Sequence, residues 1–370
     1  MTRPTIESLT NPGVLKNPPY IPGDTAESVT KKYNLTKILK LASNENQLGS
    51  SPKALEALRA EVDKSNIYPD PFSESLRAKL AKRYGLTSDN VIVTTGGSGS
   101  ISLVADVFIT AGDEAVICEP TFSLFESACV RAGANIVKCG VTEDGSFDLD
   151  AISAAVTDRT KLVYICNPNN PTGGTIEHDA LLAFTDSLPA HVIVIIDEAY
   201  ISFATDPGYG SLADAVNDER RLIVMRTFSK DYGLAALRIG YLLTSTEIHS
   251  MLMRAVNAFL GSRPGLSAAL AALDDEEFLQ LSVQTVVDGR KYLTGELEKL
   301  GFRVFPSQSN FIYVDTGFNT ADFAEKCKTR GLIIRGNFEF NRISIGTSEQ
   351  NEQVVEIVKA VLADGVAPRS

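Results

Sequence analysis

The 370-residue sequence has no tryptophan, only three histidines and only five cysteines. The histidines (His178, His191 and His249) do not stand near other ligand-type residues at metal spacing, which argues against a metal centre and against a Ser-His-Asp triad. The cysteines are odd in number and scattered, and they form no CxxC pair, a pattern typical of reduced thiols. Any acid–base chemistry should therefore depend on other groups.

Positive charge and long apolar runs are also scarce. The 35 basic and 46 acidic residues leave a net charge of −11, which argues against a nucleic-acid or anionic-membrane partner. The N-terminus, MTRPTIESLTNPG, lacks the apolar segment of a signal peptide, and no apolar run approaches the about 18 residues of a membrane span. We expect a soluble, cytoplasmic protein, long enough for one large domain and a smaller one.

Short apolar runs alternate with helical patterns in the first two thirds of the chain. The pattern predicts helices at 98–109, 121–133 and 178–188, and strands at 90–95, 114–120, 135–141, the start of 160–173, 191–200 and 221–230. Such alternation is typical of an α/β fold with a mostly parallel sheet covered on both faces. Ligands of these sheets bind beyond the carboxyl ends of the strands.

Two of these strand ends carry loops of unusual composition. TTGGSGS places Gly97, Ser98 and Gly99 between a strand and a helix, where backbone amides and the helix N-terminus can hold a phosphate. CNPNNPTGG places Asn170 in a turn after a buried strand. Either loop could equally be a structural turn.

Two further strand ends carry charged side chains. In VIVIIDEAY, Asp197 follows five aliphatic residues and Tyr200 comes three residues later. A carboxylate so close to a buried strand needs a partner, although it could instead cap the next turn. In RTFSKDYGLAALRIGY, Lys230 follows Ser229 and precedes Arg238 by eight residues; taken alone, such a lysine is usually a solvated charge.

A single ligand accounts for these groups together. Pyridoxal phosphate carries a phosphate for the glycine turn, Ser229 and Arg238, and a phenolic oxygen for Asn170 and Tyr200. Its pyridine nitrogen would be kept protonated by Asp197, and its aldehyde would form a Schiff base with Lys230. The order and chemistry of the four strand ends therefore predict a pyridoxal phosphate enzyme.

The sequence also resembles the fold-type I pyridoxal-phosphate-dependent aminotransferases and, within them, the histidinol-phosphate aminotransferase group. The resemblance runs from about residue 15 to about residue 360. It rests on PYIPGDT, LASNENQLGSSP, YPDP, PTF, CNPNNPTGG, IIDEAYISF, RTFSKDYGLAALRIGY, PSQSNFIYV, GLIIR and RISIGT.

The resemblance implies a role for each matching residue. Lys230 would be the Schiff-base lysine and would shuttle the proton. The implied cofactor contacts are Asp197 at the ring nitrogen, Asn170 and Tyr200 at the phenolic oxygen, Phe122 on the ring face, and Gly97, Ser98, Gly99, Thr227, Ser229 and Arg238 around the phosphate. The implied substrate-side residues are Tyr20, Asn44, Arg335 and Arg342.

The resemblance also implies an assembly and a division into domains. Tyr68 of YPDP would reach the phosphate of the neighbouring subunit, so the active sites would be shared within a homodimer. A large cofactor-binding domain would span residues 45–255, and a smaller α+β domain would combine the arm at 1–44 with residues 256–370.

Two departures from the group concern the substrate more than the cofactor. The glycine turn reads GSGS where the group usually has acidic residues. Only GNFEFN separates Arg335 from Arg342, where the group usually has a longer insert. Phe338 and Phe340 add apolar surface there, and Glu339, if it faces inward, would repel a phosphate.

The expected reaction is a ping-pong transfer of an amino group from an amino donor, with histidinol phosphate as the first candidate, to a 2-oxo acid such as 2-oxoglutarate. An aromatic or other amino acid is the alternative donor, and the same groups also serve decarboxylases and racemases. A nicotinamide dehydrogenase is disfavoured because the sequence has no G-x-G-x-x-G with a later ribose-binding acid. A cofactor-sensing regulator would need an appended DNA-binding segment.

Overall fold

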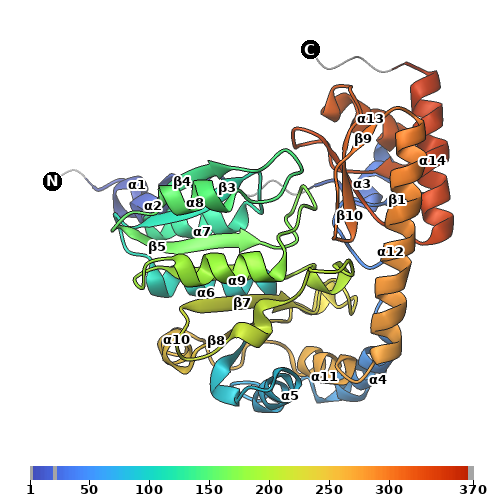
Figure 1. Cartoon of the computed structure of the whole chain (residues 1–370). Coiled ribbons are helices and arrows are strands. Elements are labelled where there is room, and N and C mark those ends of the chain that lie inside the picture. The colour runs from blue at the N-terminus through green and yellow to red at the C-terminus, as the bar shows by residue number, and fades with distance from the viewer. Residues whose placement is uncertain (1–2, 20–22, 366–370) are drawn as a thin grey trace.

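The computed structural model of the chain describes residues 3–19 and 23–365 (Figure 1). Its centre is a seven-stranded sheet in the order β2-β8-β7-β6-β5-β3-β4. Neighbouring strands are parallel except at β8, which is antiparallel to both β2 and β7. The strands are β2 (Val91–Thr94), β3 (Glu114–Glu119), β4 (Asn135–Gly140), β5 (Thr160–Cys166), β6 (Ile193–Asp197), β7 (Leu222–Thr227) and β8 (Gly240–Thr244).

The predicted α/β fold with a mostly parallel sheet is confirmed, and each predicted strand is present with slightly different ends. β8 is not predicted by the sequence pattern. The helices that flank this sheet are α4 (Pro52–Glu61), α5 (Glu74–Tyr84), α6 (Gly96–Phe108), α7 (Leu124–Ala132), α8 (Leu149–Ala155), α9 (His178–Ser187), α10 (Thr246–Leu252) and α11 (Arg263–Ala272).

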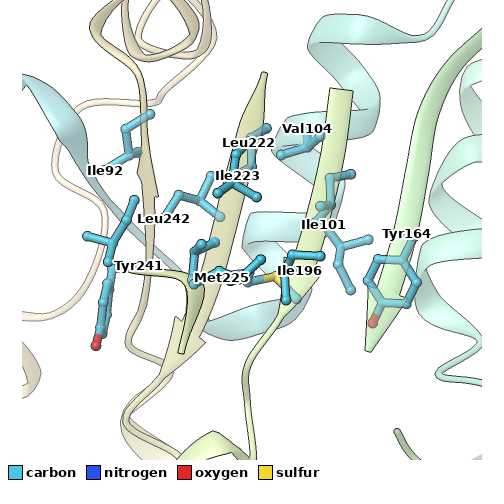
Figure 2. Packing of buried hydrophobic residues seen from close by; sticks show 14 of the residues in the cluster. Ile92, Ile101, Val104, Tyr164, Ile196, Leu222, Ile223, Met225, Tyr241 and Leu242 are labelled. Atoms are coloured by element: carbon cyan, nitrogen blue, oxygen red, sulfur yellow. The ribbon is translucent and has the colours of Figure 1, made fainter. Parts of the chain in front are cut away.

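The sheet is buried because its strands are aliphatic on both faces. All five residues of β6 are buried, as are the first four of β7. Figure 2 shows Leu222, Ile223 and Met225 of β7 packed among neighbouring strands, with Ile101 and Val104 of α6 among them. A continuous aliphatic run is what a strand covered on both faces requires. This packing fixes the strand ends that carry the polar residues.

A second, smaller core lies beside the sheet. It contains the sheet β12-β10-β9 and the strand pair β1-β11. The elements here are β1 (Leu39–Lys40), β9 (Arg303–Val304), β10 (Phe311–Asp315), β11 (Leu332–Ile333), β12 (Asn341–Ser344), α3 (Ala26–Tyr33), α13 (Thr320–Thr329) and α14 (Ser348–Ala363). Two short helices, α1 (Ile6–Leu9) and α2 (Pro12–Leu15), precede them.

The long helix α12 (Glu276–Lys299) joins the two cores. It runs from beside α4 and α11 to α13 and α14 (Figure 1). Leu279 near its start packs against the first core, whereas Leu293 and Leu297 belong to the second. The domain boundaries at residues 44/45 and 255/256 stay a prediction. Among the residues described, no helix combines the length and apolar character needed to cross a membrane.

Candidate active site

A cavity of about 520 Å³ lies at the carboxyl ends of β5, β6 and β7. It is lined from both cores, because Arg335 and Arg342 come from the second and the other residues mostly from the first. The predicted site residues that line it are Asn44, Gly97, Ser98, Phe122, Asn170, Asp197, Tyr200, Thr227, Ser229, Lys230, Arg238, Arg335 and Arg342. The structure therefore brings together most of the residues that the sequence singles out.

Lys230 projects into this cavity just beyond the end of β7. Its Nζ donates a 3.2 Å hydrogen bond to the carbonyl of Ser43 and lies 5.7 Å from the ring centre of Tyr200. The pKa of Lys230 is lowered from 10.5 to about 8, chiefly by burial and also by the charges of Arg342 and Arg238, while Glu45 and Asp197 raise it. Its amine is therefore a base and nucleophile close to neutral pH.

Asp197 ends β6 and is 3% exposed. Its Oδ2 accepts a 2.7 Å hydrogen bond from the hydroxyl of Tyr164, and its Oδ1 accepts one of 3.1 Å from the backbone amide of Ala199. Burial raises the pKa of Asp197 to about 6, although both donors and the charge of Lys230 lower it. Both hydrogen-bond donors are neutral, so this carboxylate is suited to a cationic partner from the cavity.

Two side-chain amides meet at the hydroxyl of Tyr200. It accepts hydrogen bonds from the side-chain amides of Asn44 (3.1 Å) and Asn170 (3.4 Å). Burial raises the pKa of Tyr200, which stays a neutral phenol. Asn44 is held in turn by Ser344, whose hydroxyl contacts both its backbone amide and its side-chain oxygen at 2.9 Å. The side chains of Asn44, Asn170 and Tyr200 can therefore donate hydrogen bonds to one oxygen atom of a ligand.

The N-terminus of α6 forms the anion-binding corner of the cavity. GGSGS is the first turn of the helix itself, and not a turn before it as the sequence suggests. Arg238 Nη2 donates to Ser98 Oγ at 3.2 Å. Gly96 has a φ of +71°, and a Cβ there would lie 2.6 Å from Arg238 Nη2. Glycine at this position therefore lets the guanidinium reach the helix N-terminus.

Two hydroxyls stand beside this corner at the end of β7. Thr227 Oγ1 donates to Ser229 Oγ at 2.9 Å and accepts a 3.1 Å hydrogen bond from the backbone amide of Ser229. Together with the cation of Arg238 and the helix N-terminus, they make a site for a phosphate group.

Arg335 and Arg342 lie opposite each other at the mouth of a β-hairpin. Their backbone amides and carbonyls form two reciprocal hydrogen bonds of 3.0 Å. The carbonyl of Ala42 accepts from Arg335 Nε at 3.0 Å and from Arg342 Nη2 at 2.8 Å. Arg342 also donates to the side-chain oxygen of Asn170. Two cations sharing one acceptor create a strongly positive wall that favours an anionic ligand.

The hairpin tip between these arginines carries two phenylalanines, Phe338 and Phe340. Phe338 lines the cavity, and its ring centre lies 5.5 Å from Arg342 Cζ. Phe340 packs on Phe305, with ring centres 5.2 Å apart. Glu339 is exposed and is not among the cavity-lining residues. The expected repulsion of a phosphate by an inward-facing Glu339 therefore has no basis in this arrangement.

Two predicted residues, Gly99 and Tyr68, are not among the residues that line the cavity, and a third, Tyr20, is not described. Gly99 lies in the first turn of α6, where it packs closely on Thr95. Tyr68 is 76% exposed, and its ring packs at a tilt against that of Phe259 with ring centres 4.8 Å apart. Tyr20 lies outside the described residues. The roles implied for these three stay predictions.

Sequence reasoning misses several lining or supporting residues. Tyr164 lies inside β5, where the strand pattern makes it one more core residue. Ser43 and Asn337 lie in loops whose composition carries no chemical signal. Within the described chain, no group of three or more His, Cys, Asp or Glu side chains could hold a metal ion.

The carboxyl edge of this α/β sheet presents a buried carboxylate, a lysine with a lowered pKa and an anion site at a helix N-terminus. This combination defines a pyridoxal-phosphate-dependent transferase of fold type I. Residues 36–358 match the family described as aminotransferase class I and II. The chain belongs to this family and is a pyridoxal-phosphate-dependent aminotransferase, which confirms the activity and the cofactor predicted from the sequence.

Its relatives agree with the resemblance seen in the sequence. The histidinol-phosphate aminotransferase of Brevibacillus brevis is 37% identical over 354 residues, covering 94% of this chain and 97% of that protein. That of Moorella thermoacetica is 37% identical over 356 residues, covering 95% and 92%. The crystal structure of the Sinorhizobium meliloti histidinol-phosphate aminotransferase in complex with pyridoxal-5'-phosphate matches with a TM-score of 0.89 and 26% identity, covering 96% of this chain and 98% of that one.

Proposed function

We propose that this aminotransferase moves an amino group from histidinol phosphate to 2-oxoglutarate. The observation that carries the proposal is the pair Arg335 and Arg342, which share the carbonyl of Ala42 at one wall of the cavity that contains Lys230. A dense positive wall suits the phosphate of one substrate and the carboxylates of the other. The names of the relatives support this choice.

The residues present fit pyridoxal phosphate. Asp197 is a buried carboxylate with two neutral donors and a raised pKa, and a protonated ring nitrogen would supply the missing cation. Asn170 and Tyr200 would hold the phenolic oxygen, and Phe122 would cover the ring. The phosphate would be bound by Gly97, Ser98, Gly99, Thr227, Ser229 and Arg238.

When bound, this cofactor supplies an aldehyde that reacts with amines and an electron-poor ring that withdraws electrons from the reacting carbon. Lys230 would provide the amine that holds the aldehyde, and its free amine would be the base that moves a proton from the donor's α-carbon. Its lowered pKa of about 8 makes the neutral amine accessible near neutral pH. Asp197 keeps the ring nitrogen protonated.

The donor and the acceptor would use the same wall in turn, because the cavity offers one lysine and one pair of arginines. Arg342 is 5% exposed and is fixed by Ala42 and Asn170, so its fork is preorganised for an anion. Arg335 is less buried and stands nearer the N-terminal arm, where a Cβ on Gly23 would lie 2.8 Å from its Nη1. Asn44 and Tyr20 would complete the substrate side. Ping-pong kinetics follow from such sequential use.

An aromatic amino acid is a second candidate donor. It is favoured by Phe338, which lines the cavity beside Arg342 in the short segment where the group usually has a longer insert. A ring-bearing side chain could pack against this phenylalanine while its carboxylate binds Arg342.

A homodimer with shared active sites belongs to the same proposal. Tyr68, Phe72 and Phe259 are large exposed side chains, and the ring of Tyr68 packs on that of Phe259. Such an apolar exposed group is typical of a surface covered by another protein copy. The five cysteines are free, which supports the proposed cytoplasmic location.

Initial rates with histidinol phosphate, phenylalanine and tyrosine, each with 2-oxoglutarate as acceptor, test the choice of donor. We expect the highest kcat/KM with histidinol phosphate. A higher kcat/KM with an aromatic amino acid would replace the first candidate by the second.

A further inference from the structure

Two acidic residues follow directly after the two side chains at the centre of the cavity: Glu198 follows Asp197, and Asp231 follows Lys230. Both carboxylates are buried, at 2% and 7% exposure, and neither lines the cavity. A buried carboxylate needs hydrogen bonds and a countercharge. One of their partners, Arg226, itself lines the cavity.

Arg226 is the cation shared by the two carboxylates. It lies on β7, and its Nη1 is 3.8 Å from Glu198 Oε2. Its Nη2 donates a 3.0 Å hydrogen bond to Ser202 Oγ, and the same hydroxyl donates a 2.6 Å hydrogen bond to Asp231 Oδ2. These contacts form the Glu198–Arg226–Ser202–Asp231 chain. It connects the residue after Asp197 to the residue after Lys230.

The first half of the chain is anchored to the large core. Glu198 accepts hydrogen bonds from the backbone amide of Leu212 (2.7 Å) and the hydroxyl of Ser211 (2.5 Å). Arg226 Nη1 donates to the hydroxyl of Tyr84 at 3.1 Å. Arg226 is thus fixed by several partners and makes a rigid support for Ser202.

The second half holds the main chain at Lys230. Asp231 Oδ1 accepts a 3.0 Å hydrogen bond from the backbone amide of Tyr232. The side-chain amide of Asn46 donates to the carbonyls of Lys230 and Asp231, at 3.1 Å each. The peptide segment that carries the lysine is therefore fixed by two sets of hydrogen bonds. Asn46 binds its carbonyls, and Ser202 binds the carboxylate of Asp231.

The carboxylate of Asp231 is held by Ser202 and by the backbone amide of Tyr232. The charges that affect the pKa of Lys230 most are Arg342 and Arg238, which lower it, and Glu45 and Asp197, which raise it. Asp231 is bound instead to Ser202 and faces the charge of Arg226. A freely turning carboxylate next to the lysine would stabilise the protonated amine and weaken it as a base.

We propose that Ser202 and Arg226 are positioning residues of the transfer reaction, which set the Lys230 segment relative to Asp197 through the Glu198–Arg226–Ser202–Asp231 chain. The inference rests on the proposed roles of Lys230 and Asp197. An amine that moves a proton between neighbouring atoms must be placed to a fraction of an ångström, and the placement of its main chain limits that reach.

Ser202→Ala removes the link between Arg226 and Asp231 while leaving every charge in place. We expect kcat to fall on the order of tenfold, the loss typical of one hydrogen bond to a charged group, with KM within about twofold of wild type. The visible circular dichroism of the bound cofactor should change, because it reports the orientation of the cofactor in its site. Ser202→Thr keeps the hydroxyl and should restore both signals.

Two further variants separate positioning from simple stabilisation. Thr185→Ala removes another buried hydroxyl, which bonds only within α9, and should leave kcat and the dichroism as in wild type. Arg226→Lys keeps the charge but cannot span Ser202 and Glu198 with a planar fork, and should repeat the effect of Ser202→Ala. If both Ser202→Ala and Arg226→Lys leave kcat and dichroism unchanged and lower only the unfolding temperature, the inference is wrong.

Borohydride reduction of the same proteins distinguishes failure of this inference from failure of the proposed function. We expect the cofactor on Lys230 in wild type and in every variant. Trapping on Lys230 with unchanged kcat in Ser202→Ala overturns only the positioning role, whereas trapping elsewhere in wild type overturns the proposed roles as well.

Discussion

Tyr164 donates a 2.7 Å hydrogen bond to Oδ2 of Asp197 from the neighbouring strand of the central sheet. Tyr164 is fully buried and its ring stacks on Phe125, with centres 4.4 Å apart, so the hydroxyl has little freedom to turn elsewhere (Figure 2 shows its place in the core). The hydrogen bond favours the ionised carboxylate and opposes the cost of its burial. The charge of Asp197 therefore depends on a residue outside the cavity lining.

Asp197→Asn should stabilise the cofactor-free protein while abolishing most of its activity. Burial raises the pKa of Asp197 in the folded state from 3.8 to about 6. The stability linked to its protonation is present below about pH 4 and is lost as the pH rises through about 6. The neutral amide avoids this loss, so the unfolding temperature of the cofactor-free variant should exceed that of wild type at neutral pH but not below about pH 4.

The same variant should lose at least about a hundredfold in kcat, because an amide cannot keep a ring nitrogen protonated. Thermal melts over a pH series and steady-state kinetics measure the two effects. Wild-type activity in Asp197→Asn would contradict the role of the carboxylate.

Tyr164→Phe should shift the acid side of the pH profile upward. The substitution keeps the stacked ring but removes the donor that lowers the pKa of Asp197, so this carboxyl protonates at a higher pH. We expect the acidic limb of kcat/KM to move up by about one pH unit, the size typical of a hydrogen bond to a charged group. An unchanged acidic limb would mean that the hydroxyl does not control this charge.

The two arginines should separate the substrates. Arg342→Lys loses a planar fork, and kcat/KM should fall on the order of tenfold to a hundredfold for every donor. Arg335→Ala should impair histidinol phosphate far more than glutamate, if Arg335 binds the phosphate. Steady-state kinetics with both donors measure the difference. Equal losses for the two donors would show that Arg335 does not read the side chain of the substrate.

Complementation between subunits tests the shared site. Tyr68→Phe keeps the ring packed on Phe259 but removes the hydroxyl, and Lys230→Ala removes the amine. Hybrid dimers carry one site with both residues intact, so a refolded mixture should exceed the summed activity of its two parents. Sedimentation should detect the dimer. A fully active monomer would contradict the proposal.

The central sheet and most of the cavity could be predicted because both follow from local patterns. Aliphatic runs separated by helical patterns require a mostly parallel sheet, and the carboxyl ends of parallel strands meet at one edge. Asp197, Lys230 and Asn170 each follow such a run, so their convergence is a consequence of topology. Arg335 and Arg342 come from the second core, and only resemblance to a family connects them to the cavity.

The rest depends on packing that no local pattern encodes. β8 enters antiparallel between β2 and β7, a position that its short apolar run GYLLT does not specify. In the sequence pattern Tyr164 is one more core residue, because the pattern does not show that its hydroxyl points to Asp197. The contact of Ser202 with Asp231 joins residues from two separate segments, and neither sequence segment implies it.

Borohydride reduction of the cofactor-loaded enzyme, followed by trypsin digestion and mass spectrometry, identifies the residue that carries the cofactor. We expect the added mass on the peptide 227–238, at Lys230, and no labelled peptide in Lys230→Ala. Because Lys230 combines a lowered pKa with a position at the cavity edge of β7, no other lysine should compete for the aldehyde. Label on a different lysine, or wild-type turnover by Lys230→Ala, would contradict the assignment.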